Sequence, residues 1–231
     1  MTLQCVTKSN ICDLIKSLNE NGNENDFDKF KDKYIKLFKP VLYNYDTETN
    51  FDSISGLYYI SNFLDSDEMT QIQEFLNSEV KFKPITKSSN SRRVAQFGYT
   101  YAYDRSGVEP TEPIPEIFKT LVSSLKLNNI VKSNLIEREF DQLIINEYTP
   151  GQEIAYHTDH PVQFDDIIAC ITIGQSVPIM FRNGNDIRKL DIAAGSMYIM
   201  TGDSRYKWKH HLKNNGTTNR YSLTYRKVKL N

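Results

Sequence analysis

Short apolar runs separated by turn signals fill the chain beyond Phe140. The runs are QLIINEY, DIIACITIG, VPIMFRNG, KLDIAAG, SMYIMTGD and RYSLTYRKVKL. They are short for helices and rich in β-branched and aromatic residues, so each predicts a β-strand. Strands this short and this numerous are typical of a sandwich or a jelly-roll barrel. The pattern therefore predicts a mainly β fold.

Two supporting helices are predicted upstream of these strands. After the strand-like GLYYISNFL, Asp65 and Glu68 have the spacing of a capping box, and apolar residues then recur at helical spacing. These apolar residues are Met69, Ile72, Phe75 and Leu76. A second helix is predicted from Pro115, again from helical spacing. Its apolar residues are Ile117, Phe118, Leu121, Val122 and Leu125.

Residues 1–50 have a different pattern from the rest of the chain. NENGNENDFDKF is polar and low in complexity, and FDKFKDKYIKLFKP could form a short amphipathic helix that ends at Pro40. We expect an N-terminal appendage over residues 1–50, partly helical or disordered, and one folded domain over residues 51–231.

Composition restricts the class of protein. Of the 231 residues 39% are hydrophobic and 25% are charged, and no stretch approaches the roughly 20 apolar residues of a membrane span. The N-terminus has polar and acidic residues too early for a secretory signal, and the three cysteines include no C-x-x-C pair. We expect a soluble intracellular monomer, cytoplasmic or nuclear, without membrane contact.

Charge is unevenly distributed along the chain. The net charge of −1 argues against a nucleic-acid binder that relies on bulk electrostatics. However, the segment from Lys81 to Tyr103 and the segment after Asp203 are both basic and free of acids. A local positive surface and ordinary solvated charge are both consistent with this pattern.

The segment AYHTDHP concentrates groups that can bind a metal. His157 and Asp159 are two residues apart, so both side chains leave the same face of an extended segment. With one more histidine they would form the two-histidine, one-carboxylate set of non-haem Fe(II) oxygenases. His210 or His211 could supply the third donor. The alternative is a surface histidine without a metal, because H-x-D is common by chance.

The segment RYSLTYR predicts a strand with one wholly polar face. Arg220, Ser222, Thr224 and Arg226 share that face, and Tyr221, Leu223 and Tyr225 share the other. Two arginines roughly 20 Å apart along a strand could lean inward around a small dicarboxylate. In INEYTPG, Asn146 and Tyr148 also share a face and could hold the other side of the same ligand. An exposed strand with solvated arginines is the alternative.

Together these motifs resemble the AlkB-like Fe(II)- and 2-oxoglutarate-dependent dioxygenases. The matching pieces are NEYTPGQEIAYHTD, GDSRYKWKH and RYSLTYRKV, with GLYYISNFLDSDE and RRVAQFGYTYAY upstream, over about residues 56 to 229. The resemblance implies a jelly-roll (double-stranded β-helix) core and an oxidoreductase that uses Fe(II), 2-oxoglutarate and O2, with ascorbate as reductant in vitro. It makes His157, Asp159 and His210 the iron ligands, while His211 stands where relatives usually have a small residue. The implied 2-oxoglutarate residues are Asn146, Tyr148, Arg220, Ser222, Thr224 and Arg226, the two arginines taking its two carboxylates.

The resemblance also extends to a nucleotide-recognition lid near residues 82–104. Its basic and aromatic residues suit phosphate contact and stacking on an unpaired base. These candidate substrate residues are Arg92, Arg93, Phe97, Tyr99 and Tyr101. The alternative is a strand pair whose aromatics pack on a sheet.

The implied substrate is an alkylated or modified base in RNA or single-stranded DNA, which the enzyme would hydroxylate or oxidatively demethylate. Pro161 stands where some DNA-repairing members carry a further acid, and the RYKW segment is similar to the branch that acts on transfer RNA. DNA repair and RNA modification thus both stay open. A protein or small-molecule substrate is the second hypothesis, and a jelly-roll binding module without turnover is the third.

Overall fold

The structure is a computed structural model, and it describes residues 54–88, 91–103, 107–122 and 139–229. The chain divides into two compact units, residues 1–44 and residues 45–231. The first unit, like the appendage expected over residues 1–50, lies outside the described residues. The described residues all belong to the second unit.

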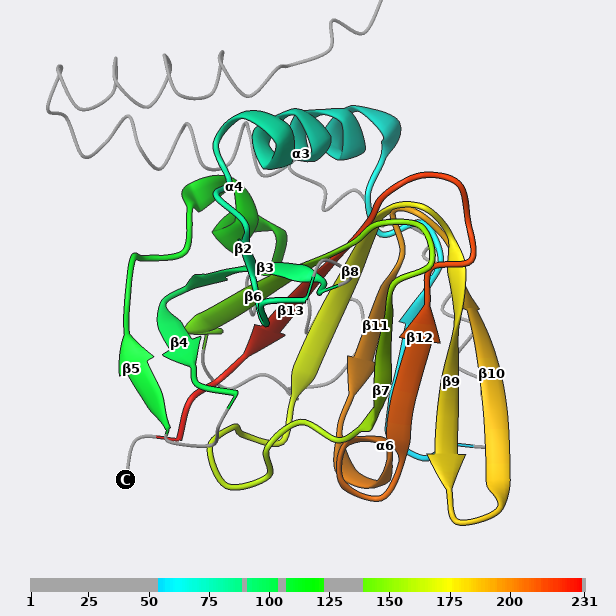
Figure 1. Ribbon diagram of the computed structural model, residues 1–231. Coiled ribbons are helices and arrows are strands. Elements are labelled where there is room, and N and C mark those ends of the chain that lie inside the picture. Colours follow the sequence, from blue (N-terminus) through cyan, green and yellow to red (C-terminus); the bar gives the residue numbers. More distant parts are fainter. Residues whose placement is uncertain (1–53, 89–90, 104–106, 123–138, 230–231) are drawn as a thin grey trace, which may run out of the picture. The chain divides into compact units, whose positions relative to one another are not determined.

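A large antiparallel sheet of seven strands forms one layer of this unit (Figure 1). Its strand order is β1-β11-β8-β13-β6-β3-β2. The strands are β1 (Leu57–Ile60), β2 (Lys83–Pro84), β3 (Arg93–Phe97), β6 (Gln142–Tyr148), β8 (Ile168–Gly174), β11 (Met197–Met200) and β13 (Arg220–Arg226). Because β6, β8 and β13 lie in the middle of the sheet, nearly all their residues are buried.

A smaller antiparallel sheet faces the large one. Its order is β10-β9-β12-β7. The strands are β7 (Glu153–His157), β9 (Val177–Asn183), β10 (Asp186–Ile192) and β12 (Lys209–Lys213). Alternate residues of both sheets meet in a core cluster that includes Ile168, Ile179, Phe181 and Leu212. Two facing antiparallel sheets with crossing connections make a jelly roll, so the predicted fold class is confirmed.

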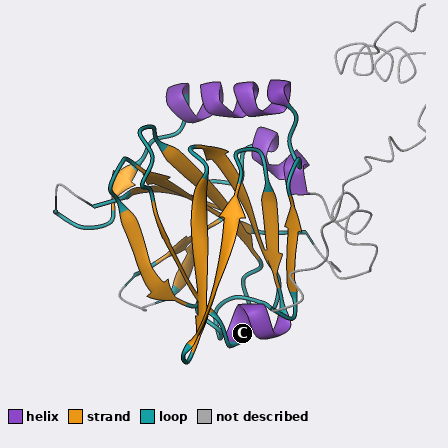
Figure 2. Ribbon diagram, turned by 90° about the vertical axis from the view of Figure 1, so that its right-hand side faces the viewer, coloured by secondary structure: helices purple, strands orange, loops and turns teal. Residues whose placement is uncertain are grey.

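The helices pack on the other face of the large sheet (Figure 2). They are α3 (Ser66–Ser78), α4 (Glu116–Lys119) and a 3-10 turn (Thr120–Val122), whereas α6 (Gly202–Tyr206) lies in the connection from β11 to β12, at the opposite end of the sheets. The capping box predicted for α3 is present, because Asp65 Oδ1 accepts a hydrogen bond from the Glu68 N–H and Glu68 accepts one from the Asp65 N–H. Ile72 and Leu76 of α3 are buried against the sheet, as their spacing predicted.

Several boundaries differ from the sequence prediction. The second helix does begin after Pro115, but the α-helix is only four residues long and continues as the 3-10 turn to Val122, while Leu125 lies outside the described residues. The end of SMYIMTGD is not strand, since Thr201 is the N-cap of α6. β4 (Tyr99–Tyr101) and β5 (Val108–Pro110) pair in a separate two-stranded sheet. No helix in the described part of the chain is long and apolar enough to cross a bilayer.

Candidate metal centre and active-site cavity

The pairing of β7 with β12 brings two histidines together. His210 is the direct cross-strand partner of His157, and their ring centroids are 4.2 Å apart. Asp159 follows in the loop after β7, with its Oδ2 3.7 Å from His210 Nε2. One ligand atom from each of the three residues lies within 4.8 Å of the other two. This is a compact donor set that could hold a single metal ion.

His211 lies apart from this set. It is the next residue of β12, so alternation turns its ring to the opposite face of the sheet. There the ring contacts Tyr156, with centroids 5.0 Å apart. The geometry therefore supports His210 rather than His211 as the third donor.

Both histidines of the set present a bare nitrogen. The Nδ1–H of His157 donates to the Ala155 carbonyl at 2.8 Å, which leaves Nε2 free. Burial lowers the pKa of His157, and burial together with the nearby His157 lowers the pKa of His210 to about 3. Both rings are therefore neutral at physiological pH, as a metal ligand must be.

Asp159 is held in position and in its charged form by two arginines. Arg226 donates to Asp159 Oδ1 from Nε at 2.6 Å and also from Nη2, which leaves Oδ2 facing His210. Arg205 donates to the carbonyls of Asp159 at 2.8 Å and His160 at 3.1 Å. Burial alone would raise the pKa of Asp159, but Arg226 foremost, and then the two histidines, hold it well below its usual range.

The donor set opens into a cavity of about 390 Å³ between the two sheets. One wall consists of residues from β6 and β13 that share the polar face predicted from sequence. They are Asn146, Tyr148, Ser222, Thr224 and Arg226. Asp159 is the only carboxylate among the described residues that line the cavity. The cavity thus suits an anionic ligand that approaches the metal site.

Arg220 lies two cross-strand pairs beyond Ser222, on the same face of β13 and opposite Tyr148. It is fully buried at 0% exposure, and its guanidinium carbon lies 5.7 Å from the centroid of the Tyr148 ring. Its Nη2 donates to Thr172 Oγ1 at 3.1 Å, but Nε and Nη1 have no hydrogen-bond partner among the described residues. A buried guanidinium without a partner for its charge destabilises the fold. A carboxylate ligand that accepts from its unused donors would offset this cost. The expectation for Arg226 fits less well, since its guanidinium already contacts Asp159.

The lid residues that were predicted to contact the substrate fall into two groups, those that line the cavity and those that do not. Arg92 and Tyr101 line the cavity, and Arg92 Nε donates to Asn146 Oδ1 at 3.1 Å. Arg93 points to the other face of the large sheet, where its Nη2 donates to the buried Glu147 at 2.8 Å. Phe97 packs on Phe118 in the helix-side core, with ring centroids 6.4 Å apart.

Tyr99 does not line the cavity either, although its carbonyl accepts a hydrogen bond from Gln142. The structure therefore brings Arg92 and Tyr101 to the site, and not Arg93, Phe97 or Tyr99.

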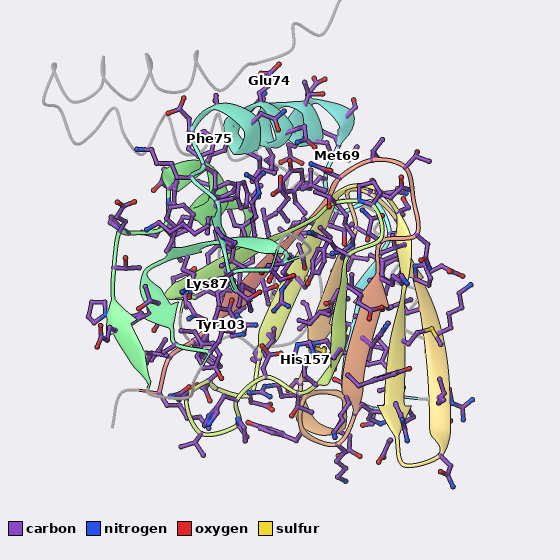
Figure 3. All side chains as sticks on the ribbon, viewed as in Figure 1. Met69, Glu74, Phe75, Lys87, Tyr103 and His157 are labelled. Atoms are coloured by element: carbon purple, nitrogen blue, oxygen red, sulfur yellow. The ribbon has the colours of Figure 1, made fainter. Side chains whose placement is uncertain are left out.

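Sequence reasoning missed several residues of the site. Tyr103 lines the cavity and is 41% exposed, so it stands at the opening, and Thr158 and His160 also line the cavity. Figure 3 labels Tyr103 and His157, which both line this cavity. Arg205 was also missed, although it lies within the family-like GDSRYKWKH segment, which was the available signal. Further lining residues without such a signal are Phe164, Tyr198 and Met200.

Comparison with known proteins identifies the family to which the chain is similar. The sequence model of the 2OG-Fe(II) oxygenase superfamily matches residues 56–226. The mouse protein "tRNA (carboxymethyluridine(34)-5-O)-methyltransferase ALKBH8" is 30% identical over 158 residues, which are 67% of this chain and 24% of that protein. The chain thus spans about a quarter of the length of this relative.

Solved structures share the fold. OsALKBH1 superposes with a TM-score of 0.61 at 17% identity over 74% of this chain and 96% of that one. A Pseudomonas putida prolyl-4-hydroxylase superposes with a TM-score of 0.52 at 12% identity, over 78% of this chain and 96% of that one. The chain therefore belongs to the 2OG-Fe(II) oxygenase superfamily, as an AlkB-like oxidoreductase that uses Fe(II), 2-oxoglutarate and O2.

Proposed function

We propose that this protein is a dioxygenase that hydroxylates, and so oxidatively demethylates, a modified base in RNA or single-stranded DNA. The observation that carries the proposal is that one cavity joins three elements. These elements are the His157–Asp159–His210 donor set, a wall of polar side chains that leads to Arg220, and an opening flanked by Arg92, Tyr101 and Tyr103.

His157, Asp159 and His210 would hold the iron. Two neutral imidazoles and one carboxylate on one side of the ion leave its other positions for ligands, as in non-haem Fe(II) oxygenases. When bound, the iron together with 2-oxoglutarate and O2 supplies the oxidation of a C–H bond, with succinate and carbon dioxide as co-products. Arg226 and Arg205 keep Asp159 charged and turned toward the site.

Arg220 would bind the carboxylate of 2-oxoglutarate farther from the metal. Its Nε and Nη1 carry no hydrogen bond among the described residues, so the buried guanidinium keeps N–H donors for a ligand carboxylate. Burial raises the pKa of Tyr148 to about 12, so its hydroxyl stays a donor at physiological pH. Asn146, Ser222 and Thr224 supply further polar contacts along the same wall. In this arrangement Arg226 acts mainly on Asp159 rather than on a ligand carboxylate.

Arg92, Tyr101 and Tyr103 would receive the base. Arg92 brings a positive charge to the opening, and the rings of Tyr101 and Tyr103, 5.4 Å apart, offer aromatic surface to a flat substrate. A base can reach such a cavity only when it is unpaired or flipped out of the stack. The printed name of the mouse relative concerns transfer RNA, which supports a nucleic-acid substrate. Hydroxylation of a methyl group on a ring nitrogen would yield formaldehyde and the unmodified base.

Turnover with Fe(II), ascorbate and 2-oxoglutarate tests the proposal. The substrates are a panel of methylated RNA and single-stranded DNA oligonucleotides, together with a panel of peptides. We expect succinate release to be stimulated by at least one methylated oligonucleotide, to disappear in His157→Ala and to persist in the matched control His211→Ala. Stimulation by a peptide and by no oligonucleotide would favour the second candidate, a hydroxylase of a protein. Absence of iron binding in an anaerobic titration would refute enzymatic activity altogether.

A further inference from the structure

The outer face of the small sheet carries two cations beside the metal centre. Phe181, His210 and His157 form one cross-strand row on the inner face of the small sheet, where both histidines line the cavity. The adjacent row places Lys209 directly opposite Arg182. Because side chains alternate along strands, both cations point to the outer face, away from the cavity. β7 and β9 run in the same direction (Figure 1). Arg182 and Lys209 therefore lie at the same end of the small sheet as His157.

The carboxylates on this outer face form ion pairs with other cations. Asp191 lies 2.9 Å from Lys189, and Glu153 lies 3.9 Å from Lys213. Arg182 and Lys209 have no carboxylate at ion-pair distance among the described residues, and both are exposed. Like charges directly opposite one another on adjacent strands are unfavourable. A bound anion would remove this repulsion.

An aromatic side chain adjoins the two cations. The Arg182 guanidinium carbon lies 5.8 Å from the centroid of the Tyr156 ring, and Arg182 Nε donates to the Gly184 carbonyl at 3.0 Å. Tyr156 in turn contacts the ring of His211. Tyr156 belongs to β7, the edge strand of the small sheet, and directly precedes His157. The cations and the ring therefore lead along the sheet from β9 to the edge strand β7, which ends at His157.

We infer that Arg182, Lys209 and Tyr156, called here the outer anion site, bind the sugar–phosphate backbone and one base of a single-stranded nucleic acid. The inference rests on the proposed function and deepens it, because it places the nucleotides that flank the modified base on this face of the small sheet. Arg182 and His157 are two strand spacings and one residue step apart in the small sheet, so their backbones are roughly 10 Å apart. Nucleotides next to a base held in the cavity therefore lie within reach. Cations beside an exposed ring are typical of sequence-tolerant single-strand binding.

Binding of unmodified single-stranded RNA, measured by fluorescence anisotropy over a series of salt concentrations, tests the inference. Each phosphate contact contributes about 0.7 to the slope of log affinity against log salt, so Arg182→Gln/Lys209→Gln is expected to make the slope shallower by about 1.4. Tyr156→Ala is expected to weaken binding roughly five- to hundredfold with the slope unchanged. Melting temperatures of the variants establish that they are folded.

Arg188→Gln/Lys189→Gln is the matched control. It removes the same charge from the neighbouring β10, where Arg188 contacts Asp186 at 2.8 Å and Lys189 contacts Asp191. We expect its salt slope to equal that of the wild type. Equal slopes for both double variants, whether changed or unchanged, would overturn the inference, as would displacement of RNA by polyglutamate at equal charge concentration.

Failure of the proposed function would look different. In that case the wild type would bind no RNA or single-stranded DNA, and no oligonucleotide would stimulate succinate release. If the inference alone fails, the wild type binds RNA and Arg182→Gln/Lys209→Gln binds it with the same salt slope.

Discussion

Arg220 gives the sharpest prediction, because stability and ligand affinity should respond in opposite directions. Its guanidinium is fully buried and donates a hydrogen bond to Thr172. Among the described residues it has no carboxylate partner. Replacement of an incompletely partnered buried charge by an apolar side chain of similar length is often neutral or stabilising. We therefore expect Arg220→Met without ligand to unfold at a temperature no lower than that of the wild type.

The affinity for 2-oxoglutarate should fall steeply in the same variant. A hydrogen bond to a charged group contributes about 1.5–3 kcal/mol, so loss of the two hydrogen bonds between Arg220 and a ligand carboxylate costs about 3–6 kcal/mol. At 1.4 kcal/mol for each factor of ten, the dissociation constant rises roughly 10²- to 10⁴-fold. The metal affinity should stay the same, because Arg220 contacts none of the three donor residues.

Thermal unfolding with Mn(II) in place of iron measures both effects without turnover. At a 2-oxoglutarate concentration of about 100 times Kd, the wild type should gain about 2.7 kcal/mol. For a domain of this size the gain corresponds to a rise in Tm of roughly 5–11 °C. Arg220→Met should gain about 0.4 kcal/mol or less at that concentration, which is a rise of at most about 1–2 °C. A lower ligand-free Tm combined with a full ligand-induced rise would refute the reasoning and make Arg220 a structural residue.

Three further predictions concern the metal centre and the opening. His210→Ala should abolish metal binding in an anaerobic Fe(II) titration whereas His211→Ala keeps it, and loss in both variants would contradict the assignment. Arg205→Lys keeps the charge but loses the fork that spans two carbonyls, so metal affinity should fall about 10- to 100-fold, and an unchanged titration would rule out a positioning role. Tyr103→Ala should raise KM for an oligonucleotide about tenfold with kcat little changed, since it removes stacking, and a fall in kcat alone would argue for another role.

The polar wall of the cavity was predictable because period-two alternation is a local property. In β13 the residues Tyr221, Leu223 and Tyr225 enter the helix-side core, so Ser222 and Thr224 must face the cavity. The same logic applies to the donor set, where two-residue spacing put His157 and Asp159 together. The choice of His210 over His211 came from the resemblance, and the register of β12 against β7 now supplies its physical reason.

The lid could not be predicted in the same way. Alternation from Phe97 to Tyr101 would put these aromatics on one face, but Gly98 adopts a left-handed φ of +75° between them. An added Cβ at Gly98 would lie 1.8 Å from the Asp141 carbonyl oxygen, so the close packing requires glycine and turns the chain between β3 and β4. Phe97 therefore stays in the core while Tyr101 reaches the cavity. Only the tertiary structure shows this change of face.

The contact between Arg226 and Asp159 joins the two halves of the site. Arg226 extends from the large sheet, whereas Asp159 follows a strand of the small sheet, and the ion pair is buried. Removal of Arg226 leaves a buried carboxylate without its main cation and free to turn away from His210. Arg226→Met should therefore lose metal affinity first and 2-oxoglutarate affinity only as a consequence.

This prediction separates the two arginines of β13. Arg220→Met should retain Mn(II) binding and lose 2-oxoglutarate binding, whereas Arg226→Met should lose both. Anaerobic Mn(II) titration of the two variants, followed by addition of 2-oxoglutarate, distinguishes the outcomes. If Arg226→Met bound Mn(II) as tightly as the wild type and lost only 2-oxoglutarate, each arginine would serve one carboxylate of the ligand. The ion pair with Asp159 would then be secondary, because a residue that orients a metal ligand cannot be removed without an effect on the metal.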